Sequence, residues 1–192
     1  MASHQRLSSQ EELARYQCHE NSLEDEGYRQ WLESFIDLVF QDYSLETTAK
    51  ILDFGSGPTP SLAALMTQRG YAVELEDPYF APGSPPGPFS LITSLEVFEH
   101  LAHPEQVVEN LALRLEKGGR LCIGTSFHSF TKESLHQFES WSYRSDPTHI
   151  GFFTRKGLDH LMRCYGLQAH GGDGKRYACY RLSCPPERAM LG

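Results

Sequence analysis

The sequence contains no apolar run that approaches the ~20 residues of a membrane-spanning helix. The N-terminal residues, Met1-Ala-Ser-His-Gln-Arg6, lack the apolar core that a secretion signal requires. The chain also has no internal repeat and no composition shift that would mark a second domain. We therefore expect a cytoplasmic protein without a membrane span.

Cysteine is scarce and unpaired in the sequence. The five cysteines are odd in number and scattered, and none forms a Cys-x-x-Cys pair. This pattern is typical of a reducing compartment and gives no disulfide framework. The spacing of Cys179 and Cys184 is a poor metal signature, so we expect no metal site.

Basic segments are also missing. The net charge is −8, and the longest basic groupings are pairs such as Arg155-Lys156 and Lys175-Arg176. Proteins that bind DNA or RNA usually carry a basic patch. Nucleic acid is therefore disfavoured, and a small molecule or a protein is the more plausible partner. The sequence does not indicate an oligomeric state.

A length of 192 residues predicts one domain over 1–192. We expect an N-terminal helical cap over 1–45, a core over 46–184 and a tail over 185–192. In the cap, the capping box Ser9-x-x-Glu12 predicts a helix over 10–17. A second helix is expected from near Ser22, because its apolar residues follow the i, i+3, i+4 spacing of one helix face: Tyr28, Trp31, Leu32, Phe35, Ile36 and Val39.

The core alternates strand and helix signals. Strands are expected at 50–54, 71–76, 89–94 and 120–125, and helices at 61–69, 104–117, 131–141 and 154–165. Residues 78–88 are rich in proline and glycine and predict a loop. The chain closes with segments 167–171 and 175–183 on either side of Asp173-Gly174, which is a hairpin turn signal.

The first strand leads into a glycine turn, Ile51-Leu-Asp-Phe-Gly-Ser-Gly-Pro-Thr-Pro60. Gly55 and Gly57 allow a tight turn and a close approach of the backbone to a ligand. Asp77 follows the second strand, 22 positions after Gly55. An acid at that place usually binds the ribose hydroxyls of an adenosine-containing cofactor.

Three segments together resemble the class I S-adenosylmethionine (SAM)-dependent methyltransferases. They are Leu52-Asp-Phe-Gly-Ser-Gly57, Phe89-Ser-Leu-Ile-Thr-Ser-Leu-Glu-Val-Phe-Glu-His100 and Leu115-Glu-Lys-Gly-Gly-Arg-Leu-Cys-Ile-Gly124. The resemblance covers about residues 45–183. It implies SAM as cofactor and an α/β, Rossmann-like fold. The expected sheet is mostly parallel and twisted, with an antiparallel hairpin strand at its C-terminal end.

A narrower similarity is to bacterial methyltransferases of the ubiquinone/menaquinone-methylase-like group. It lies in Tyr143-Arg-Ser-Asp-Pro-Thr-His-Ile-Gly-Phe-Phe153 and in Arg15-Tyr-x-x-His-x-Asn21. This similarity does not identify the methyl acceptor. Quinol-like, natural-product, thiol and carboxylate acceptors all stay open, as does a protein side chain.

The resemblance and the position of these residues at strand ends give a set of cofactor candidates: Asp53, Gly55, Ser56, Gly57, Asp77, Pro78, Leu95 and Glu96. Asp53 could order the loop or reach the methionyl ammonium through water. The alternative is that Asp53 only stabilises the loop and makes no ligand contact. Asp77 could instead be a turn aspartate before Pro78. Glu99 follows the same strand as Glu96 and faces the same two alternatives, ligand contact or exposed turn.

On the acceptor side, His149 is the candidate general base, because an imidazole titrates near neutral pH. Tyr143, in the same segment, is the second candidate catalytic residue, and we expect this segment to cross above the sheet edge. His100 is a second candidate base. The alternative for His149 is a histidine that only bonds the backbone and fixes the lid, and the alternative for His100 is a structural role in the turn. Substrate or lid contacts are expected from Tyr16, His19 and Trp141.

Two departures from the methyltransferase pattern leave an alternative open. Thr59 occupies the place of a third glycine, and 78–88 is too short for the usual helix and third strand. A degenerate fold that binds SAM or a partner without catalysis is therefore the second reading. An NAD-dependent oxidoreductase is the third, and the missing third glycine and the terminal hairpin disfavour it.

Overall fold

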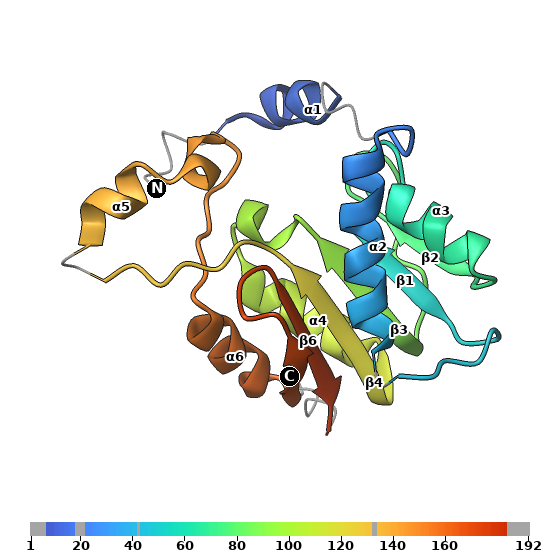
Figure 1. Cartoon of the computed structure of the whole chain (residues 1–192). Helices are drawn as coiled ribbons and strands as arrows, with labels where there is room; N and C mark the ends of the chain where they lie inside the picture. Colours follow the sequence, from blue (N-terminus) through green and yellow to red (C-terminus); the bar gives the residue numbers. More distant parts are fainter. Residues whose placement is uncertain (1–6, 18–21, 42, 132–133, 184–192) are drawn as a thin grey trace, which may run out of the picture.

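The computed structural model describes residues 7–17, 22–41, 43–131 and 134–183 (Figure 1). Its helices, including the 3-10 turns η2 and η4, are α1 (Ser9–Gln17), α2 (Glu26–Phe40), α3 (Ser61–Gln68), η2 (Phe98–His100), α4 (Pro104–Leu113), α5 (Leu135–Glu139), η4 (Ser142–Ser145) and α6 (Arg155–Cys164). Its strands are β1 (Ile51–Phe54), β2 (Val73–Glu76), β3 (Phe89–Leu95), β4 (Leu115–Gly124), β5 (Leu167–Gly172) and β6 (Tyr177–Leu182).

The six strands form one sheet in the order β2-β1-β3-β4-β6-β5. The pairs from β2 to β4 are parallel, whereas β6 pairs antiparallel with both β4 and β5. The mostly parallel sheet with an antiparallel C-terminal hairpin is confirmed. β2 forms one edge, because residues 78–88 add only the isolated bridge between Asp77 and Ala81. The short third-strand region expected from the sequence is therefore confirmed as well.

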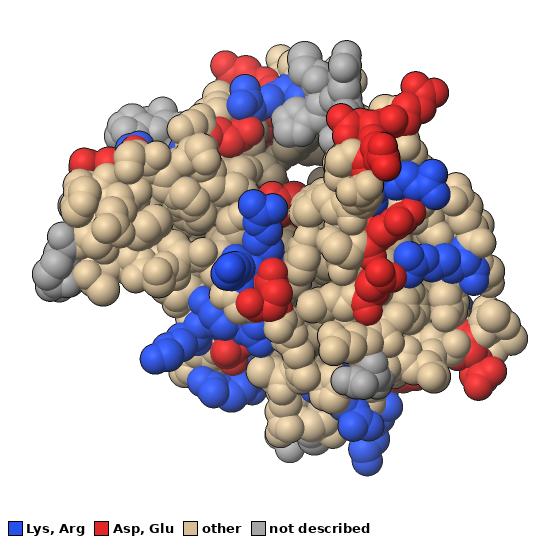
Figure 2. Space-filling view, viewed as in Figure 1, with Lys and Arg blue, Asp and Glu red and all other residues tan. Residues whose placement is uncertain are grey.

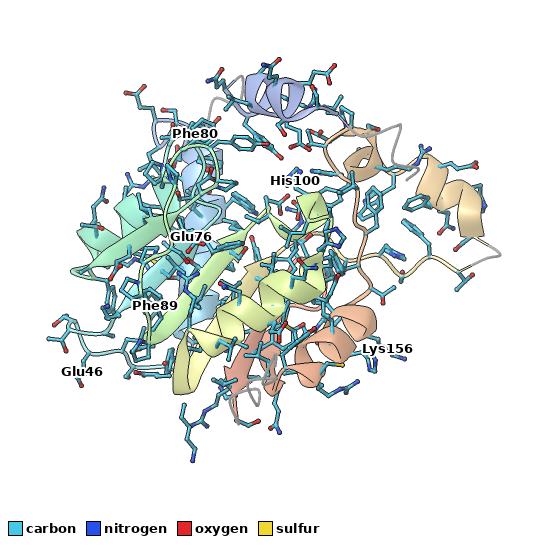
Figure 3. The ribbon with its side chains drawn as sticks, turned by 180° about the vertical axis from the view of Figure 1, so that it is seen from behind. Glu46, Glu76, Phe80, Phe89, His100 and Lys156 are labelled. Carbon is cyan, nitrogen blue, oxygen red and sulfur yellow. The ribbon has the colours of Figure 1, made fainter. Side chains whose placement is uncertain are left out.

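Helices cover both faces of the sheet. α2 and α3 pack on one face, and α4 and α6 pack on the other, which Figure 3 shows from behind. The apolar stripe expected on the second helix is confirmed, with Leu32, Phe35, Ile36 and Val39 buried. Among the described residues, no helix is both long and apolar enough to cross a membrane.

The helix starts in the N-terminal cap differ from expectation. α1 is capped by Ser8 and Glu11 rather than by Ser9 and Glu12, since the Ser8 amide donates to Glu11 Oε2 at 2.8 Å. α2 begins at Glu26 instead of near Ser22, because Asp25 accepts a hydrogen bond from the Tyr28 amide and caps the helix. In both cases a neighbouring polar residue makes the better N-cap.

The largest correction concerns the segment after α4. We expected a helix over 104–117, but α4 ends at Leu113 and β4 already begins at Leu115. Leu115 pairs with Phe89 and is buried, so tertiary packing overrides the local helical pattern. The helix expected over 131–141 is only α5, five residues long. The first residues of the strand expected at 71–76 lie outside β2.

The last helix and the hairpin follow the sequence signals closely. Thr154 caps α6 by accepting from the Gly157 amide, and Gly166 follows with a φ of 76°. Asp173 accepts three backbone N–H groups at the hairpin turn, from Lys175, Arg176 and Tyr177. This turn places β6 between β4 and β5.

Candidate active site

A cavity of about 740 Å³ lies where β1, β2 and β3 end. Its walls also include side chains of α1, α2 and the segment around η4. The space-filling view shows the molecule hollowed beneath α1, with acidic and basic side chains interspersed on this face (Figure 2). The carboxyl ends of parallel strands are the usual ligand edge of such a sheet.

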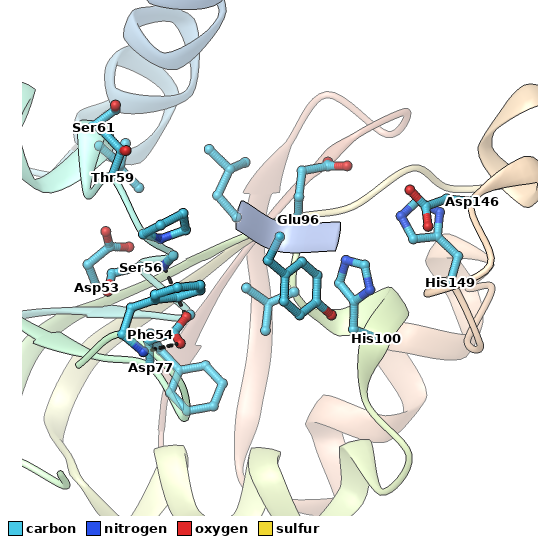
Figure 4. A pocket seen from close by; sticks show the side chains of 18 of the residues that line it. Asp53, Phe54, Ser56, Thr59, Ser61, Asp77, Glu96, His100, Asp146 and His149 are labelled. Atoms are coloured by element: carbon cyan, nitrogen blue, oxygen red, sulfur yellow. Dashed lines mark hydrogen bonds between the residues drawn. The ribbon is translucent and has the colours of Figure 1, made fainter. Parts of the chain in front are cut away.

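Nearly all the expected site residues line this one cavity. They are Asp53, Gly55, Ser56, Gly57, Asp77, Pro78, Leu95 and Glu96 from the cofactor set, and Tyr16, Trp141, Tyr143 and His149 from the acceptor set. Figure 4 shows Asp53, Ser56 and Asp77 on one side of the pocket and His100, Asp146 and His149 on the other. His19 lies outside the described residues.

The glycine turn requires glycine at two positions. Gly55 and Gly57 have φ values of 79° and 67°, in the left-handed region that other residues rarely adopt. A Cβ at Gly55 would overlap Val97, whereas a Cβ at Gly57 would have no atom within 4 Å. Gly57 therefore presents open backbone to the cavity. Thr59, at the place of the third glycine, is exposed and lines the cavity too.

Asp77 fastens the glycine turn to the loop after β2. Its Oδ2 accepts from the Gly57 amide at 3.0 Å, and its Oδ1 accepts from the amides of Tyr79 and Phe80 at 2.9 and 3.1 Å. Asp77 is thus a turn aspartate as well as a cavity residue. A carboxylate has about four acceptor positions. Three are used here, which leaves one for a ligand hydroxyl.

Asp53 and Ser56 are buried polar groups beside the turn. Burial raises the pKa of Asp53 to about 7, and a hydrogen bond from Thr93 Oγ1 at 3.1 Å opposes this rise. Asp53 therefore keeps its proton to a higher pH than an exposed aspartate does. The buried Ser56 Oγ has no hydrogen-bond partner among the described residues. An unsatisfied buried hydroxyl next to a cavity is a natural contact for a ligand.

Glu96 has a strained backbone. It is the one non-glycine residue with positive φ, 53°, in the described part of the chain. Burial, followed by the neighbouring Glu99, raises the pKa of Glu96 to about 8. Tyr143 donates from its hydroxyl to Glu96 Oε2 at 3.2 Å. Backbone outliers of this kind gather at functional sites, where the surrounding structure holds them in place.

Tyr143 is a hydrogen-bonding group rather than a base in this geometry. Burial, with Glu99 and Glu96 nearby, raises the pKa of its phenol well above the ordinary value. Its hydroxyl lies 3.2 Å from Thr125 Oγ1. The phenol stays protonated at neutral pH and can donate to a neighbouring oxygen.

His149 and His100 each have one ring nitrogen that makes no hydrogen bond within the described ranges of the chain. Nδ1 of His149 lies 2.6 Å from the Tyr143 carbonyl oxygen, and Nδ1 of His100 lies 3.1 Å from that of Thr148. Because a carbonyl only accepts, each Nδ1 carries the proton and each Nε2 has an available lone pair. Burial lowers the pKa of His149, so this imidazole is neutral at pH 7. Its geometry fits a general base.

The segment around η4 is tied to α1 across the cavity mouth. Arg15 donates from Nε and from a terminal nitrogen to the Asp146 carboxylate, at 3.0 to 3.2 Å. Burial raises the pKa of Asp146, but hydrogen bonds from Arg15 and Thr148 outweigh it and hold the pKa well below its usual range. Tyr16 packs edge-on against His100, and Trp141 packs against Tyr143.

Sequence reasoning missed several cavity residues. They are Glu12, Tyr28, Trp31, Leu32, Tyr79, Phe80, Val97, Leu101, Ser126, Ser142 and Arg176. Three of these, from α2, were assigned only to a core-facing stripe. The half-buried aromatics at the edge of that stripe were the available signal, because large exposed aromatics on a cap helix often face a ligand.

A family model described as a methyltransferase domain matches residues 26–170. No curated protein matches the chain. The fold is similar to that of a putative methyltransferase from Bacillus halodurans, with a TM-score of 0.56 and 13% identity over 73% of this chain and 70% of that one.

Two further structures share the fold. One is from the complex between the Haloferax volcanii Trm112 methyltransferase activator and the putative methyltransferase, with a TM-score of 0.59, 15% identity and coverage of 84% of this chain and 92% of that chain. The other is the magnesium protoporphyrin IX methyltransferase from Synechocystis with bound S-adenosylhomocysteine, with a TM-score of 0.57, 14% identity and coverage of 81% and 82%. The resemblance to class I methyltransferases is confirmed, and the narrower group stays a prediction. By the match over residues 26–170, the chain belongs to the methyltransferase domain family.

Proposed function

We propose that this protein is a SAM-dependent methyltransferase that transfers a methyl group to a small molecule. The observation that carries the proposal is one shared cavity, in which the glycine turn and Asp77 face Tyr143 and His149. Its volume of about 740 Å³ lies within the range of about 300–1,000 Å³ that is common for small-molecule sites. This volume suits a cofactor and a compact acceptor together.

The cofactor is held at the glycine turn. The open side of Gly57 lets the backbone approach it, and the unsatisfied Ser56 Oγ offers a hydrogen bond. Asp77 has one acceptor position left for a ribose hydroxyl. Tyr79 and Phe80, which follow Asp77 along the cavity wall, provide an apolar surface where the usual third strand is missing.

SAM supplies a methyl group already activated on a sulfonium, so the transfer is a direct displacement. The protein mainly holds donor and acceptor in line, an effect that can contribute ~7–11 kcal/mol. His149, neutral and with Nε2 free, takes a proton from the acceptor where one must be removed. The Tyr143 hydroxyl, which donates its proton to Glu96, orients the acceptor by accepting a hydrogen bond from it.

The acceptor lies between the η4 segment and the end of β3. Trp141 and Tyr143 form an aromatic wall there, with ring centroids 5.1 Å apart. Arg15 and Asp146 fasten this wall to α1. The chain is proposed to act as one domain over 1–192, with the N-terminal cap, residues 1–45, as part of the acceptor site.

A non-catalytic SAM-binding or partner-binding module is the second candidate. Two observations favour it: Thr59 lines the cavity, and Asp77 already accepts three backbone hydrogen bonds. Among the similar folds, the Haloferax volcanii structure was determined with an activator. Methyl transfer to any acceptor by the purified protein would eliminate this candidate.

The test is calorimetric titration of the full chain with S-adenosylhomocysteine, SAM and NAD. We expect micromolar binding of the two adenosyl ligands and none of NAD. Asp77→Asn should weaken binding by about 10- to 100-fold, because a hydrogen bond to a charged group is worth ~1.5–3 kcal/mol.

The matched control is Asp173→Asn. Asp173 also accepts three backbone N–H groups at a turn but does not line the cavity. It should leave cofactor affinity unchanged within a factor of about two, even if the melting temperature falls. No binding of either adenosyl ligand by the parent protein would refute the proposal.

A further inference from the structure

A second constellation in the cavity is formed by Glu99, His100 and His149. One ligand atom from each of the three lies within 4.8 Å of the others. Nε2 of His100 is 4.0 Å from Glu99 Oε1. Two of these residues come from η2 and one from the segment after η4, so the fold brings them together from 50 positions apart.

Glu99 has the environment of a ligand rather than of a structural acid. Its side chain is fully buried, and Oε2 accepts a hydrogen bond from Thr125 Oγ1 at 2.8 Å. Oε1 is buried without a hydrogen-bond partner in the described part of the chain. A buried carboxylate oxygen without a partner is costly, and a bound cation satisfies it.

Both imidazoles are held in the tautomer that leaves Nε2 available. Their Nδ1 atoms bond the carbonyl oxygens of Thr148 and Tyr143. Metal-binding histidines characteristically donate their other ring nitrogen to a carbonyl or a carboxylate in this way. His149 is also buried, and His100 packs against it with ring centroids 4.8 Å apart.

We propose that Glu99, His100 and His149 form a divalent transition-metal site at the acceptor end of the cavity. Two imidazoles and one carboxylate suit Zn²⁺, Co²⁺, Mn²⁺ or Fe²⁺ better than Mg²⁺, which prefers oxygen ligands. Metal–ligand bonds are about 2.0–2.2 Å long. The side chains therefore have to close in around the ion, because their ligand atoms are separated by up to 4.8 Å.

The remaining coordination positions face the cavity, since His100 and His149 line it. This inference rests on the proposed function in one respect, the identity of the acceptor group. A hydroxyl oxygen bound there loses its proton to water more readily, because a bound cation lowers the pKa of a coordinated hydroxyl. That oxygen then bonds to the methyl carbon, and the S–CH₃ bond breaks with its electron pair going to sulfur. The acceptor class is accordingly an alcohol or phenol. With the ion bound, Nε2 of His149 is a metal ligand and water takes the proton, so the general-base role of His149 applies only to the metal-free protein.

The experiment is titration of the metal-stripped, tag-free full chain with Co²⁺, followed by absorption spectroscopy and calorimetry. We expect one Co²⁺ per chain with a micromolar or lower Kd and a spectrum of nitrogen and oxygen ligation. Zn²⁺ should displace it, and Mg²⁺ should not. Glu99→Gln and His149→Ala should each weaken binding by about 100-fold or more, since changes to outer-shell partners alone cost about 10–100-fold.

The matched control is His128→Ala. His128 packs in an aromatic cluster with Phe130 and Trp141 and lies outside the proposed ligand set. It should leave the Kd for Co²⁺ unchanged. Glu99→Gln keeps the size of the side chain and an acceptor for Thr125, so a folded variant is expected.

Three results would overturn the proposal. They are no stoichiometric Co²⁺ binding by the parent, binding that Glu99→Gln leaves unchanged, and a thiolate absorption band that assigns the metal to cysteine. Titration with S-adenosylhomocysteine in the presence of EDTA separates the metal-site proposal from the proposed methyltransferase function, because it measures cofactor binding without metal. Cofactor binding without Co²⁺ binding removes the metal site and leaves the proposed function intact.

Discussion

Replacing Gly55 with alanine tests how the glycine turn is fixed against the segment that follows β3. The φ of Gly55 is 79°, which costs a residue with a Cβ about 1–2 kcal/mol. The added Cβ would also overlap Cγ2 of Val97 and lie 3.0 Å from Cγ1. Overpacking of this kind typically costs about 1–3 kcal/mol. We expect Gly55→Ala to lower the free energy of unfolding by about 2–5 kcal/mol.

The two contributions separate in a double-mutant cycle measured by urea denaturation. Val97→Ala removes both overlapping methyl groups and leaves Val97 Cβ at 3.2 Å from the added atom. The double variant keeps the backbone strain and the close contact with Val97 Cβ, but it loses both methyl overlaps. We expect it to be more stable than the sum of the single changes predicts, by about 1–3 kcal/mol.

Gly57→Ala is the matched control, because Gly57 also has a positive φ but would place its Cβ more than 4 Å from any atom. It should cost about 1–2 kcal/mol and show no coupling to Val97. Additivity within about 0.5 kcal/mol for Gly55→Ala and Val97→Ala would refute the contact argument.

Two further predictions concern Asp53 and Arg15. Burial raises the pKa of Asp53 to about 7, so the folded state favours the protonated carboxyl. The free energy of unfolding that this carboxyl contributes is full below about pH 4 and is lost as the pH rises through 7. Asp53→Asn should remove this pH dependence and make the cofactor-free protein more stable than the parent by roughly 4 kcal/mol at pH 8. Urea denaturation of both proteins at pH 5 and pH 8 measures the difference. Identical pH profiles for parent and variant would contradict the prediction. Arg15→Gln should change the free energy of unfolding by ~1 kcal/mol or less, yet speed amide hydrogen exchange in Ser142–Ser145, because the bond to Asp146 is lost. Arg29→Gln, which breaks an exposed pair within α2, should leave that exchange unchanged.

The parallel part of the sheet could be predicted from local signals, because β1 and β3 are mostly apolar and because β1, β2 and β3 are each followed by a glycine or an acid. The C-terminal hairpin could also be predicted from the sequence, because Asp173-Gly174 is a local turn signal. The end of α4 could not be predicted. Leu115 leaves the helix to pair with Phe89, 26 positions earlier, and no local pattern reports such a pairing.

The cavity lining near the glycine turn could be predicted, because its residues end or follow strands β1, β2 and β3 in the sequence. The lining on the opposite side, around η4, was predicted less completely. The bond between Arg15 and Asp146 joins residues 131 positions apart, and it depends on how α1 crosses the cavity. The approach of Glu99 to His149 likewise depends on the packing of η2 against the segment after η4.

The segment from Glu96 to His100 contacts both halves of the cavity. Val97 packs against Gly55 at the cofactor end, while the side chain of Glu96 accepts from Tyr143 at the acceptor end. The positive φ of Glu96 directs the side chains of Glu96 and Val97 toward opposite ends of the cavity. The Glu96 amide donates a hydrogen bond to the Gly124 carbonyl. A ligand that displaces Gly55 therefore shifts the same short segment that hydrogen-bonds Tyr143. Binding of cofactor and acceptor should be coupled through these five residues, with the strained Glu96 backbone between them.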